Sequence, residues 1–261
     1  MGIYEKLILP RLLDLPMRNS RLAAYRQQTV GSANGLVLEI GIGSGLNLPL
    51  YGRAVDRICG IDPSSELLDR ASKRVAGARV PVLLVRASAE QLPFSEAAFD
   101  TLVMSWTLCS IPNPGAPLAE MRRVLKPGGR FFFAEHGLSP EPRIIRWQRR
   151  MTPCWKQIGG GCHLDRKMDD LIRAAGFGVD ALETGYMKGP EALDLHLSGC
   201  GDEVADIPTG QLLSRVLVGF RLVWLVHIRR ASRNPRHRTD RAAQCRPTPS
   251  SWRPTKRARL L

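Results

Sequence analysis

The stretch Val37-Leu-Glu39-Ile-Gly41-Ile-Gly43-Ser-Gly45-Leu-Asn47 decides how this chain is expected to fold. It continues an apolar run that starts at Leu36, and three alternating glycines follow. Glycine tolerates positive φ angles and lets a ligand lie against the backbone. A helix that follows such a turn offers free N–H groups at its N-terminus. The stretch therefore predicts a buried strand that ends in a ligand-binding turn.

Four further apolar runs follow the first, and each is short and bounded by turn residues; they cover residues 57–61, 82–85, 101–105 and 130–134. Runs that are apolar on both faces are typical of parallel strands covered by helices. Helical patterns at 64–75, 114–125 and 165–175 separate the runs, and Gly176 ends the last helix before a strand at 179–184. This alternation predicts an α/β fold: a Rossmann-like, doubly wound, mainly parallel sheet with helices on both faces.

The chain divides into three segments around this core. Residues 1–34 predict two helices separated near Pro16, and residues 35–190 form the α/β domain. Inside that domain, residues 137–164 hold three prolines and a short basic helix at 143–150. We expect this insertion to cap the edge of the sheet where ligands bind in open α/β folds. Residues 191–261 are an atypical basic tail.

Composition limits the cellular setting and the partners. The first 15 residues mix charged and apolar positions, which predicts an amphipathic helix rather than a signal peptide. None of the six cysteines forms a Cys-x-x-Cys pair, so we expect a reducing, cytoplasmic setting. The net charge is +14, but residues 229–261 alone hold eleven Lys and Arg against one acid. The folded part is thus only mildly basic, which disfavours a nucleic-acid partner.

Two features of the glycine turn distinguish its ligand from a dinucleotide. The spacing is Gly-x-Gly-x-Gly, whereas the pyrophosphate fingerprint is Gly-x-Gly-x-x-Gly. An acid, Glu39, also precedes the first glycine by two residues, which disfavours an anionic ligand. S-adenosylmethionine carries an ammonium and a sulfonium but no phosphate, so a carboxylate at this position suits it.

A second acid supports this interpretation. Asp62 ends the second apolar run and lies 17 residues beyond Gly45. An acid at this place accepts hydrogen bonds from ribose hydroxyls in other nucleoside sites of this architecture. Taken alone, Asp62-Pro63-Ser64 also reads as a plain turn with a helix cap. The combination with the glycine turn favours the cofactor site.

Five motifs recur in order: Glu39-x-Gly-x-Gly-x-Gly45, Ile61-Asp-Pro63, Ser88-Ala-Glu-Gln-Leu-Pro-Phe94, Phe99-Asp100 and Val124-Leu-Lys-Pro-Gly-Gly129. Over about residues 7–190 they resemble class I methyltransferases of the type 11, ubiquinone/menaquinone-methyltransferase-like branch. Further motifs are similar to bacterial relatives of the membrane-associated mammalian enzymes that methylate alkyl thiols. They are Tyr4-x-x-x-Ile8-Leu-Pro10, Ser105-Trp-Thr-Leu-Cys109, Glu135-His-Gly137 and Gly160-Gly-Cys-His163-Leu-Asp-Arg166.

The resemblance implies a cofactor site made of residues from several motifs. Glu39, Gly41, Gly43, Gly45 and Asn47 would surround the methionine part, and Asp62 would hold the ribose. Pro63 would belong to the same site, Leu67 would pack near the adenine, and Ser88, Ala89 and Glu90 would line the adenine edge. Ser105 and Trp106 would face the transferred methyl group. Most relatives carry Asp where Ser88 stands, which puts one hydrogen bond to the adenine amine in doubt.

Methyl transfer needs alignment of donor and acceptor and often a base that deprotonates the acceptor. Candidates are His136, His163, Cys109 and Cys162, and we assign the catalytic role to His163 because it follows a flexible glycine run in the cap. The alternatives are that His163 bonds a backbone group, that Cys109 is a buried apolar residue and that His136 only closes its strand. No paired ligand spacing supports a metal site.

The family resemblance stops at Pro190, and no counterpart of the family's last strand follows. Residues 191–201 can be encoded by codons that, read one base later, encode such a strand. This suggests an out-of-frame translation or a recent frameshift. The composition after Arg229 also fits a disordered basic tail. Residues 212–228 are apolar but interrupted by two arginines, which is marginal for a membrane span.

Three functions follow from these observations. The first is S-adenosylmethionine-dependent methyl transfer to a small, lipophilic acceptor such as a thiol or a quinone-like molecule. The second is methylation of RNA or another nucleic acid, and the third is cofactor binding without catalysis. The Asn/Asp-Pro-Pro-Tyr/Trp motif of base amino-methylases is missing after the fourth strand, which favours the first. The amphipathic start and the Arg- and Trp-containing cap allow peripheral membrane contact.

Overall fold

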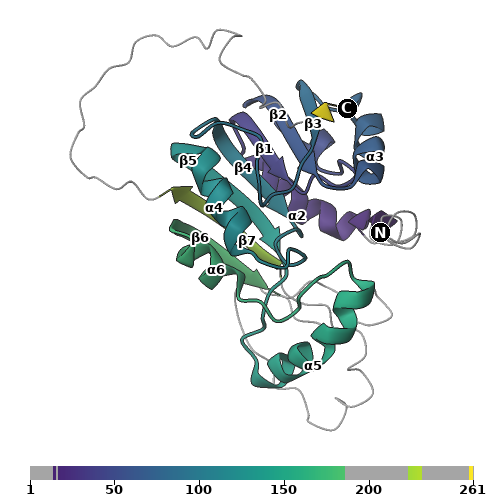
Figure 1. The fold of residues 1–261 in the computed structure, drawn as a ribbon, viewed down its shortest axis with the longest axis vertical. Helices are drawn as coiled ribbons and strands as arrows, with labels where there is room; N and C mark the ends of the chain where they lie inside the picture. Colours follow the sequence, from purple (N-terminus) through teal and green to yellow (C-terminus); the bar gives the residue numbers. More distant parts are fainter. Residues whose placement is uncertain (1–13, 16, 186–222, 231–258, 261) are drawn as a thin grey trace, which may run out of the picture.

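The computed structural model describes residues 14–15, 17–185, 223–230 and 259–260 (Figure 1). Its strands are β1 (Gly35–Ile40), β2 (Val55–Asp62), β3 (Val82–Arg86), β4 (Phe99–Ser105), β5 (Leu125–Glu135), β6 (Phe177–Gly185), β7 (Val223–Arg230) and β8 (Arg259–Leu260). Its helices are α2 (Ser20–Gly31), α3 (Ser65–Val75), α4 (Gly115–Val124), α5 (Pro142–Ile158) and α6 (Met168–Ala174), with a short 3-10 turn, η2 (Leu48–Leu50).

The strands form one sheet in the order β6-β7-β5-β4-β1-β2-β3-β8. β1 pairs in parallel with β2 on one side and with β4 on the other. The chain therefore proceeds outward from β1 to β3, returns to β4 and then proceeds the other way. In open α/β sheets ligands bind outside the carboxyl ends of the strands at such a switch point. The doubly wound, mainly parallel sheet predicted from the sequence is confirmed.

Helices cover both faces of this sheet. Successive residues of a strand point to opposite faces, so neighbouring residues pack against different helices. Leu38 and Leu102 pack in a cluster that contains residues of α4 and α6. Val37 and Val103, their neighbours along the chain, pack in a second cluster with residues of α2 and α3. Each of these four side chains is fully buried. The central strands are therefore apolar on both faces, as their sequences predict.

Several element boundaries differ from the predicted ones. Ser64 caps α3 as expected, since its Oγ accepts a hydrogen bond from the Leu67 N–H at 3.2 Å. The turn expected at 126–129 instead belongs to β5. Leu125 of β5 pairs with Phe99 of β4, and the register of the two strands shifts between Phe99 and Thr101. The helix predicted from residue 165 begins at Met168. These differences come from tertiary pairing that local patterns do not contain.

The cap contains a longer helix than the sequence predicts. α5 spans 17 residues and contains Pro153 in its interior, whereas we expected only 143–150 to be helical. Buried Gln148 ties α5 to the start of the cap, since its side chain accepts a hydrogen bond from Ser139 N–H and donates one to the Gly137 carbonyl. Figure 1 shows α5 beyond the carboxyl ends of β5 and β6, away from the sheet.

A further strand, β7, lies at Val223–Arg230, beyond residues 191–201, where the sequence lacks a counterpart of the family's last strand. β7 lies between β5 and β6 and is antiparallel to both. In the sequence these residues belong to the apolar stretch 212–228, because strand pairing across the sheet is not visible in a local pattern. The frameshift hypothesis itself concerns residues that lie mainly outside the described ones. The first predicted helix also lies mostly outside them.

None of the helices in the described residues combines the length and apolar character that a membrane crossing requires.

Candidate cofactor and acceptor site

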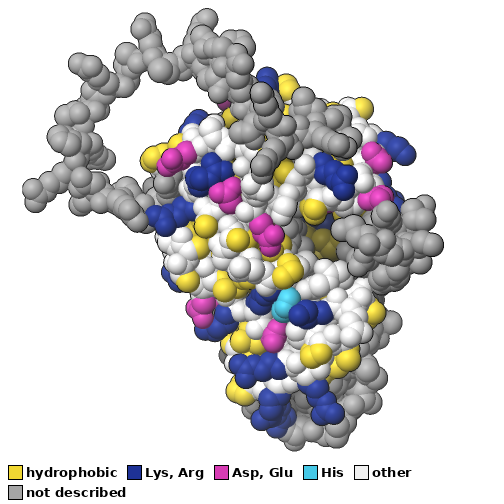
Figure 2. Space-filling model, in the orientation of Figure 1, with side chains coloured by type: hydrophobic (Ala, Val, Ile, Leu, Met, Phe, Trp, Pro, Cys, Tyr) yellow, Lys and Arg dark blue, Asp and Glu magenta, His cyan; other side chains and the backbone are white. Residues whose placement is uncertain are grey.

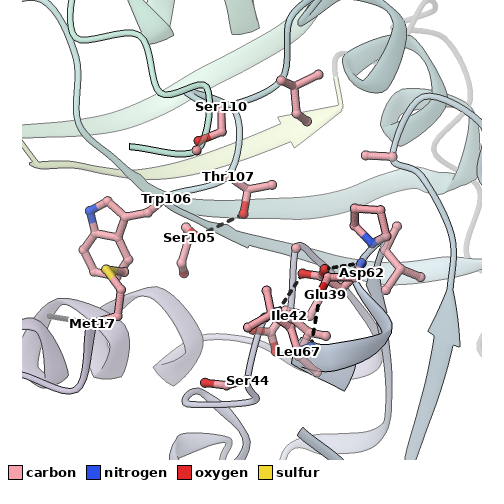
Figure 3. A pocket seen from close by; sticks show the side chains of 18 of the residues that line it. Met17, Glu39, Ile42, Ser44, Asp62, Leu67, Ser105, Trp106, Thr107 and Ser110 are labelled. Carbon is pink, nitrogen blue, oxygen red and sulfur yellow. Dashed lines mark hydrogen bonds between the residues drawn. The ribbon is translucent and has the colours of Figure 1, made fainter. Parts of the chain in front are cut away.

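A cavity of about 500 Å³ opens at the carboxyl ends of β1, β2 and β4 (Figure 3). Its volume lies within the range of roughly 300–1,000 Å³ that is usual for small-molecule sites. Most of the predicted cofactor residues line it: Glu39, Gly41, Gly43, Asn47, Asp62, Pro63, Leu67, Ser88, Ala89, Glu90, Ser105 and Trp106. Gly45 does not line it. The structure thus brings together residues that are up to 67 positions apart.

The glycine turn forms the floor of the cavity. Gly41, Gly43 and Gly45 all have positive φ angles, of 67°, 56° and 78°. A Cβ at Gly41 would collide with the Thr107 side chain, and one at Gly45 would lie 3.1 Å from the Ala71 Cα. Around Gly43 the space is open, apart from its own turn. Gly41 and Gly45 therefore allow tight packing, whereas Gly43 presents bare backbone to the cavity.

Glu39 lies one residue before the end of β1 and is only 2% exposed. Its carboxylate accepts hydrogen bonds from Asn47 Nδ2 at 2.8 Å and from the Tyr51 hydroxyl at 2.9 Å. Burial raises the pKa of Glu39 to about 7, and these two bonds and the charge of Arg26 oppose that rise. A buried carboxylate with a raised pKa gains from a cationic ligand, because a nearby positive charge favours the ionised form.

Asp62 ends β2, next to β1, and is 6% exposed. Its carboxylate accepts hydrogen bonds from the Gly43 N–H at 3.0 Å and the Ser64 N–H at 2.9 Å. Burial raises the pKa of Asp62 to about 6 despite both bonds. Each carboxylate oxygen keeps acceptor capacity beyond one bond. Asp62 is thus held rigidly between the glycine turn and α3 and is still able to accept hydroxyl donors.

The segment after β3 and the first turn of α3 form one side of the cavity. Leu67 and Pro63 come from the start of α3 and from the turn before it, and both line the cavity. Ser88 and Glu90 are exposed while Ala89 is buried, and the Glu90 N–H donates to Ser88 Oγ at 3.2 Å. Apolar Leu67 and Ala89 beside polar groups suit the face and edge of a purine.

The opposite side is built around Trp106, which follows β4. Trp106 has a positive φ of 49°, and its N–H donates to the Ala134 carbonyl at 2.7 Å. Non-glycine residues in this region of φ are strained, and they cluster at functional sites. The Arg26 guanidinium carbon lies 4.8 Å from the centre of the Trp106 ring, within the range of a cation–π contact.

Arg26, Asp14 and Met17 also line the cavity, and none of the three was predicted from the sequence. Arg26 is 6% exposed; it donates to the Met17 carbonyl at 2.8 Å and to Asn47 Oδ1 at 3.4 Å. Burial lowers the pKa of Arg26, and the charges of Glu39 and Asp14 oppose this. No motif signals an arginine in a helix that crosses the site, so the sequence offered no sign of this role.

The rim beyond Trp106 comes from the loop after β4 and from the end of the cap. Ser110, Ile111, Pro112 and Gly160 line the cavity there. Arg166 holds this loop, because its guanidinium donates to the carbonyls of Leu108, Ile111 and Pro112 at 2.7, 2.6 and 3.0 Å. We refer to Ser110, Ile111, Pro112 and Gly160 as the acceptor rim.

His163, the predicted catalytic residue, is not among the residues that line the cavity. The ring Nδ1 of His163 lies 3.2 Å from the Cys109 carbonyl oxygen, and the backbone N–H of His163 donates to the same oxygen at 2.9 Å. Burial lowers the pKa of His163, and nearby Arg166 adds to this. A bond to a backbone group is the alternative to a catalytic role that the sequence leaves open for His163. The role of His163 as a base stays a prediction.

The residues present fit S-adenosylmethionine better than a phosphate-bearing cofactor. Glu39 and Asp62, both buried, lie on neighbouring strands at one end of the cavity, and Figure 3 shows them close together. The bare backbone at Gly43 leaves room for the ligand beside them. Two buried carboxylates would repel a pyrophosphate, but they suit an ammonium group and a pair of ribose hydroxyls.

Comparisons with known proteins agree with this site. Residues 38–133 match the family described as "Methyltransferase domain". The solved structure of a putative methyltransferase from Bacillus halodurans superposes with a TM-score of 0.60 and 20% identity, covering 82% of this chain and all of that one. At this identity the likeness concerns the fold.

Three curated relatives are more informative. The chain is 34% identical to thiol S-methyltransferase TMT1B of Rattus norvegicus, over 59% of this chain and 64% of the rat protein. It is 30% identical to TMT1B of Homo sapiens, over 58% of this chain and 67% of the human protein. It is also 30% identical to demethylmenaquinone methyltransferase of Thermobifida fusca, over 57% and 64%. The chain thus spans about two thirds of the length of these relatives, and it belongs to the S-adenosylmethionine-dependent methyltransferases.

Proposed function

We propose that this protein transfers a methyl group from S-adenosylmethionine to the sulfur of a small, lipophilic thiol. When bound, the cofactor supplies the methyl group from its sulfonium. The thiolate sulfur of the acceptor forms a bond to that carbon while the carbon–sulfonium bond breaks, and the electron pair stays on the departing sulfur. The chain itself binds the cofactor and the acceptor, aligns the two reacting atoms and excludes water from them.

The observation that carries the thiol assignment is the chemistry of the acceptor rim. Ser110, Ile111, Pro112 and Gly160 include no side chain that titrates near neutral pH, and neither do Ser105, Trp106 and Thr107 beside them. A thiol is more acidic than an alcohol, with a pKa of about 8.5 for the side chain of free cysteine, and it is strongly nucleophilic as a thiolate. Such an acceptor needs no base from the protein, whereas an alcohol or a phenol gains much more from one.

Three groups of residues on the cofactor side contact different parts of the cofactor or close the cavity over it. Glu39 and Asn47 form a polar corner for the amino-acid part, and Asp62 accepts from the ribose. Arg26 closes the cavity from α2 against Trp106. The names of the relatives support the acceptor class: two of the three proteins described above are thiol S-methyltransferases. The third acts on demethylmenaquinone by its name, so a quinone-like acceptor is the second candidate.

The test supplies the purified full chain with cofactor labelled in the methyl group and a panel of acceptors. The panel contains alkyl thiols of increasing chain length, a naphthoquinol and RNA. We expect labelled thioether products, with kcat/KM rising as the alkyl chain lengthens. Label in the quinol alone would overturn the thiol assignment and leave the cofactor site intact. Label in RNA alone would overturn a small-molecule acceptor.

Two variants connect this activity to the site. Asp62→Asn removes the charge that faces the ribose, and we expect cofactor affinity to fall by about 10- to 100-fold, the value of one or two hydrogen bonds to a charged group. Asp56→Asn is the matched control, because Asp56 lies on the same strand but is exposed. Equal affinities for the two variants would contradict the site.

His163→Gln tests the predicted base. With a thiol that ionises in water, the composition of the acceptor rim predicts a change of less than about tenfold in kcat/KM, whereas a catalytic role of His163 predicts a larger loss. A general base contributes about 100-fold or more. A loss of that size, with cofactor affinity unchanged, would establish His163 as the base and refute the argument from the acceptor rim.

Peripheral membrane contact through α5 is part of the same proposal, since a lipophilic acceptor partitions into lipid. Arg143, Arg146, Arg149 and Arg150 are all exposed on this helix, and so is Ile158 at 54%. Figure 2 shows Lys and Arg side chains gathered over the part of the molecule where α5 lies. Anionic vesicles should bind the chain and neutral ones should not. Equal binding would contradict this contact.

A further inference from the structure

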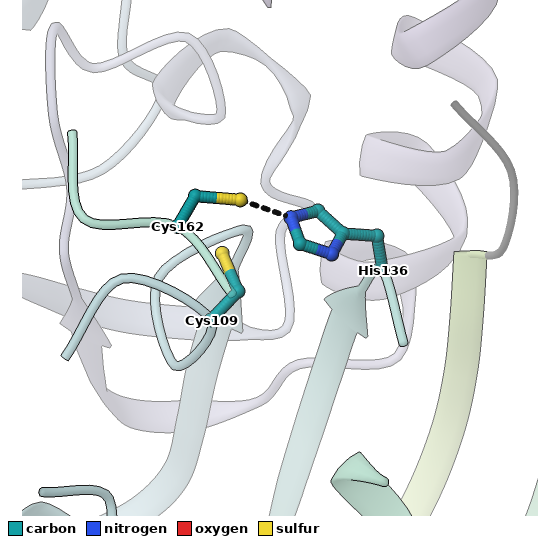
Figure 4. A group of neighbouring side chains, drawn as sticks. All are labelled: Cys109, His136 and Cys162. Atoms are coloured by element: carbon teal, nitrogen blue, oxygen red, sulfur yellow. Dashed lines mark hydrogen bonds between the residues drawn. The ribbon is translucent and has the colours of Figure 1, made fainter. Parts of the chain in front are cut away.

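Three side chains that the proposed reaction does not use meet behind the acceptor rim (Figure 4). Cys109 comes from the loop after β4, His136 follows the last residue of β5, and Cys162 follows α5. Their sulfur and imidazole nitrogen atoms all lie within 4.8 Å of one another. Both cysteines are buried, with 2% and 7% exposure, and His136 is half-buried. We call these three residues the Cys-His-Cys cluster.

The atom types match those of a zinc site, and the distances between them come within about one ångström of its geometry. Thiolate sulfur and imidazole nitrogen are the preferred zinc ligands, at about 2.3 Å and 2.0–2.1 Å from the metal. In a tetrahedral site these lengths place the ligand atoms about 3.5–3.8 Å apart. His136 Nε2 lies 2.8 Å from Cys162 Sγ, and no pair in the cluster exceeds 4.8 Å. Shifts of about one ångström would seat the metal.

A buried carboxylate and a guanidinium hold the segment that carries Cys109. Glu135 is fully buried next to His136, and its Oε1 accepts from the N–H groups of Thr107 and Leu108. The charge of His136 and a hydrogen bond with the Cys109 side chain favour the ionised form of Glu135, and Arg166 interacts with the same carboxylate. Arg166 also donates to the Ile111 carbonyl, so the backbone on both sides of Cys109 is fixed. Such supporting contacts orient the ligands of a metal site.

We propose that the Cys-His-Cys cluster binds Zn²⁺ through Cys109 Sγ, Cys162 Sγ and His136 Nε2. On binding, each cysteine forms a sulfur–zinc bond and releases one proton to water, and the imidazole binds in its neutral form through Nε2. The ligands come from three separate segments, which explains why residue spacing did not reveal the site. The sequence-based expectation of no metal rested on that spacing.

The position of the cluster defines what the metal does. None of its three residues lines the cavity, so the metal does not bind the acceptor. Cys109 directly precedes Ser110, and Cys162 follows Gly160 by two residues; both of these neighbours belong to the acceptor rim. Zinc would therefore tie the cap to the loop after β4 and hold the two halves of the rim at a fixed separation.

Metal content provides the test. The full chain, purified in the presence of zinc and freed of loosely bound metal by gel filtration, should contain one zinc per chain by elemental analysis. Replacement with Co²⁺ should produce the near-ultraviolet thiolate-to-cobalt charge-transfer band and the strong visible bands of a tetrahedral site. The cobalt spectrum uses the unmodified protein, so the test does not depend on whether any variant folds.

Variants locate the metal on the cluster. Cys109→Ser/Cys162→Ser and His136→Gln should lose the zinc and the cobalt bands. Cys59→Ser is the matched control, since Cys59 is buried in β2 outside the cluster, and Cys200→Ser/Cys245→Ser excludes binding by the remaining tail cysteines. Both controls should keep one zinc. Metal-free wild-type protein, or zinc retained by the double cluster variant, would overturn the proposal, as would a Cys109–Cys162 disulfide in protein purified with zinc.

Discussion

At the scale of single residues, Glu39 makes the electrostatics of the apo protein depend on pH. Its pKa is about 7 in the folded chain and 4.5 ordinarily, because burial disfavours the charged form. A carboxyl group with a raised pKa stabilises the fold fully below its unfolded pKa, and this contribution is lost as pH rises through the folded pKa. The window for Glu39 thus runs from about pH 4.5 to pH 7.

We predict that the apo protein loses thermal stability across this window and that Glu39→Gln reduces the loss. The neutral amide has no ionised form to desolvate, so its Tm should depend less on pH. Tyr51→Phe removes a bond that opposes the rise in pKa, and it should move the transition to higher pH. Melting curves without ligand at several pH values measure both effects. Parallel curves for wild type and Glu39→Gln would contradict the assignment.

Gly41 gives a second prediction at this scale. Its φ of 67° and the close Thr107 side chain leave no room for a Cβ. Gly41→Ala should lower the free energy of unfolding by about 1–2 kcal/mol from the backbone strain and by more from the clash with Thr107, and it should weaken cofactor binding. Gly52→Ala is the control, because a Cβ there meets nothing within 4 Å. Similar denaturation midpoints for the two variants would refute this account.

At the scale of elements, the start of α3 connects helix capping to the cofactor site. Ser64 Oγ accepts from the Leu67 N–H, and the Ser64 N–H donates to Asp62. Ser64→Ala should cost about 1 kcal/mol, the usual value of an N-cap, and should lower cofactor affinity modestly because Leu67 lines the cavity. Ser72→Ala, on the exposed side of the same helix, should do neither. Urea unfolding and calorimetry check both statements.

Local patterns predicted most elements of the core because local physics determines them. The five parallel strands are apolar on both faces, and Ser64 and Gly176 mark helix ends by a side-chain cap and by a positive φ of 85°. The patterns failed where distant contacts decide. Pro153 suggested a loop, yet α5 continues through it. Arg26 and the Cys-His-Cys cluster depend on segments that meet only in the folded chain.

At the scale of the whole molecule, β7 completes the sheet. It pairs with β5 over Arg130–Glu135 and with β6 over Phe177–Gly185. A chain that ends at residue 190 would leave both strands without these partners, and unpaired edges promote aggregation. We predict a lower Tm and more aggregation for it than for a chain that ends at residue 235, which keeps β7. Circular dichroism and light scattering compare the two.

Equal stability of the two truncated chains would show that residues 223–230 contribute nothing to the sheet. It would then favour the hypothesis of a shifted reading frame after residue 190. The coding DNA tests that hypothesis directly, since codons for residues 191–201 that are incompatible with the shifted strand would exclude it.

The division of the cavity wall has a consequence for engineering. Residues on the cofactor side come from α2, from β1 and the turn after it, from β2, α3 and the segment after β3, and from the end of β4, whereas the acceptor rim comes from residues 110–112 of the loop after β4 and from the end of the cap. Exchanging these two loops for those of another enzyme should therefore change which molecules are methylated without altering the affinity for the methyl donor. Cys109, His136 and Cys162 would have to be kept or exchanged together, because a variant with only part of the cluster would lack the metal that connects the two halves of the rim.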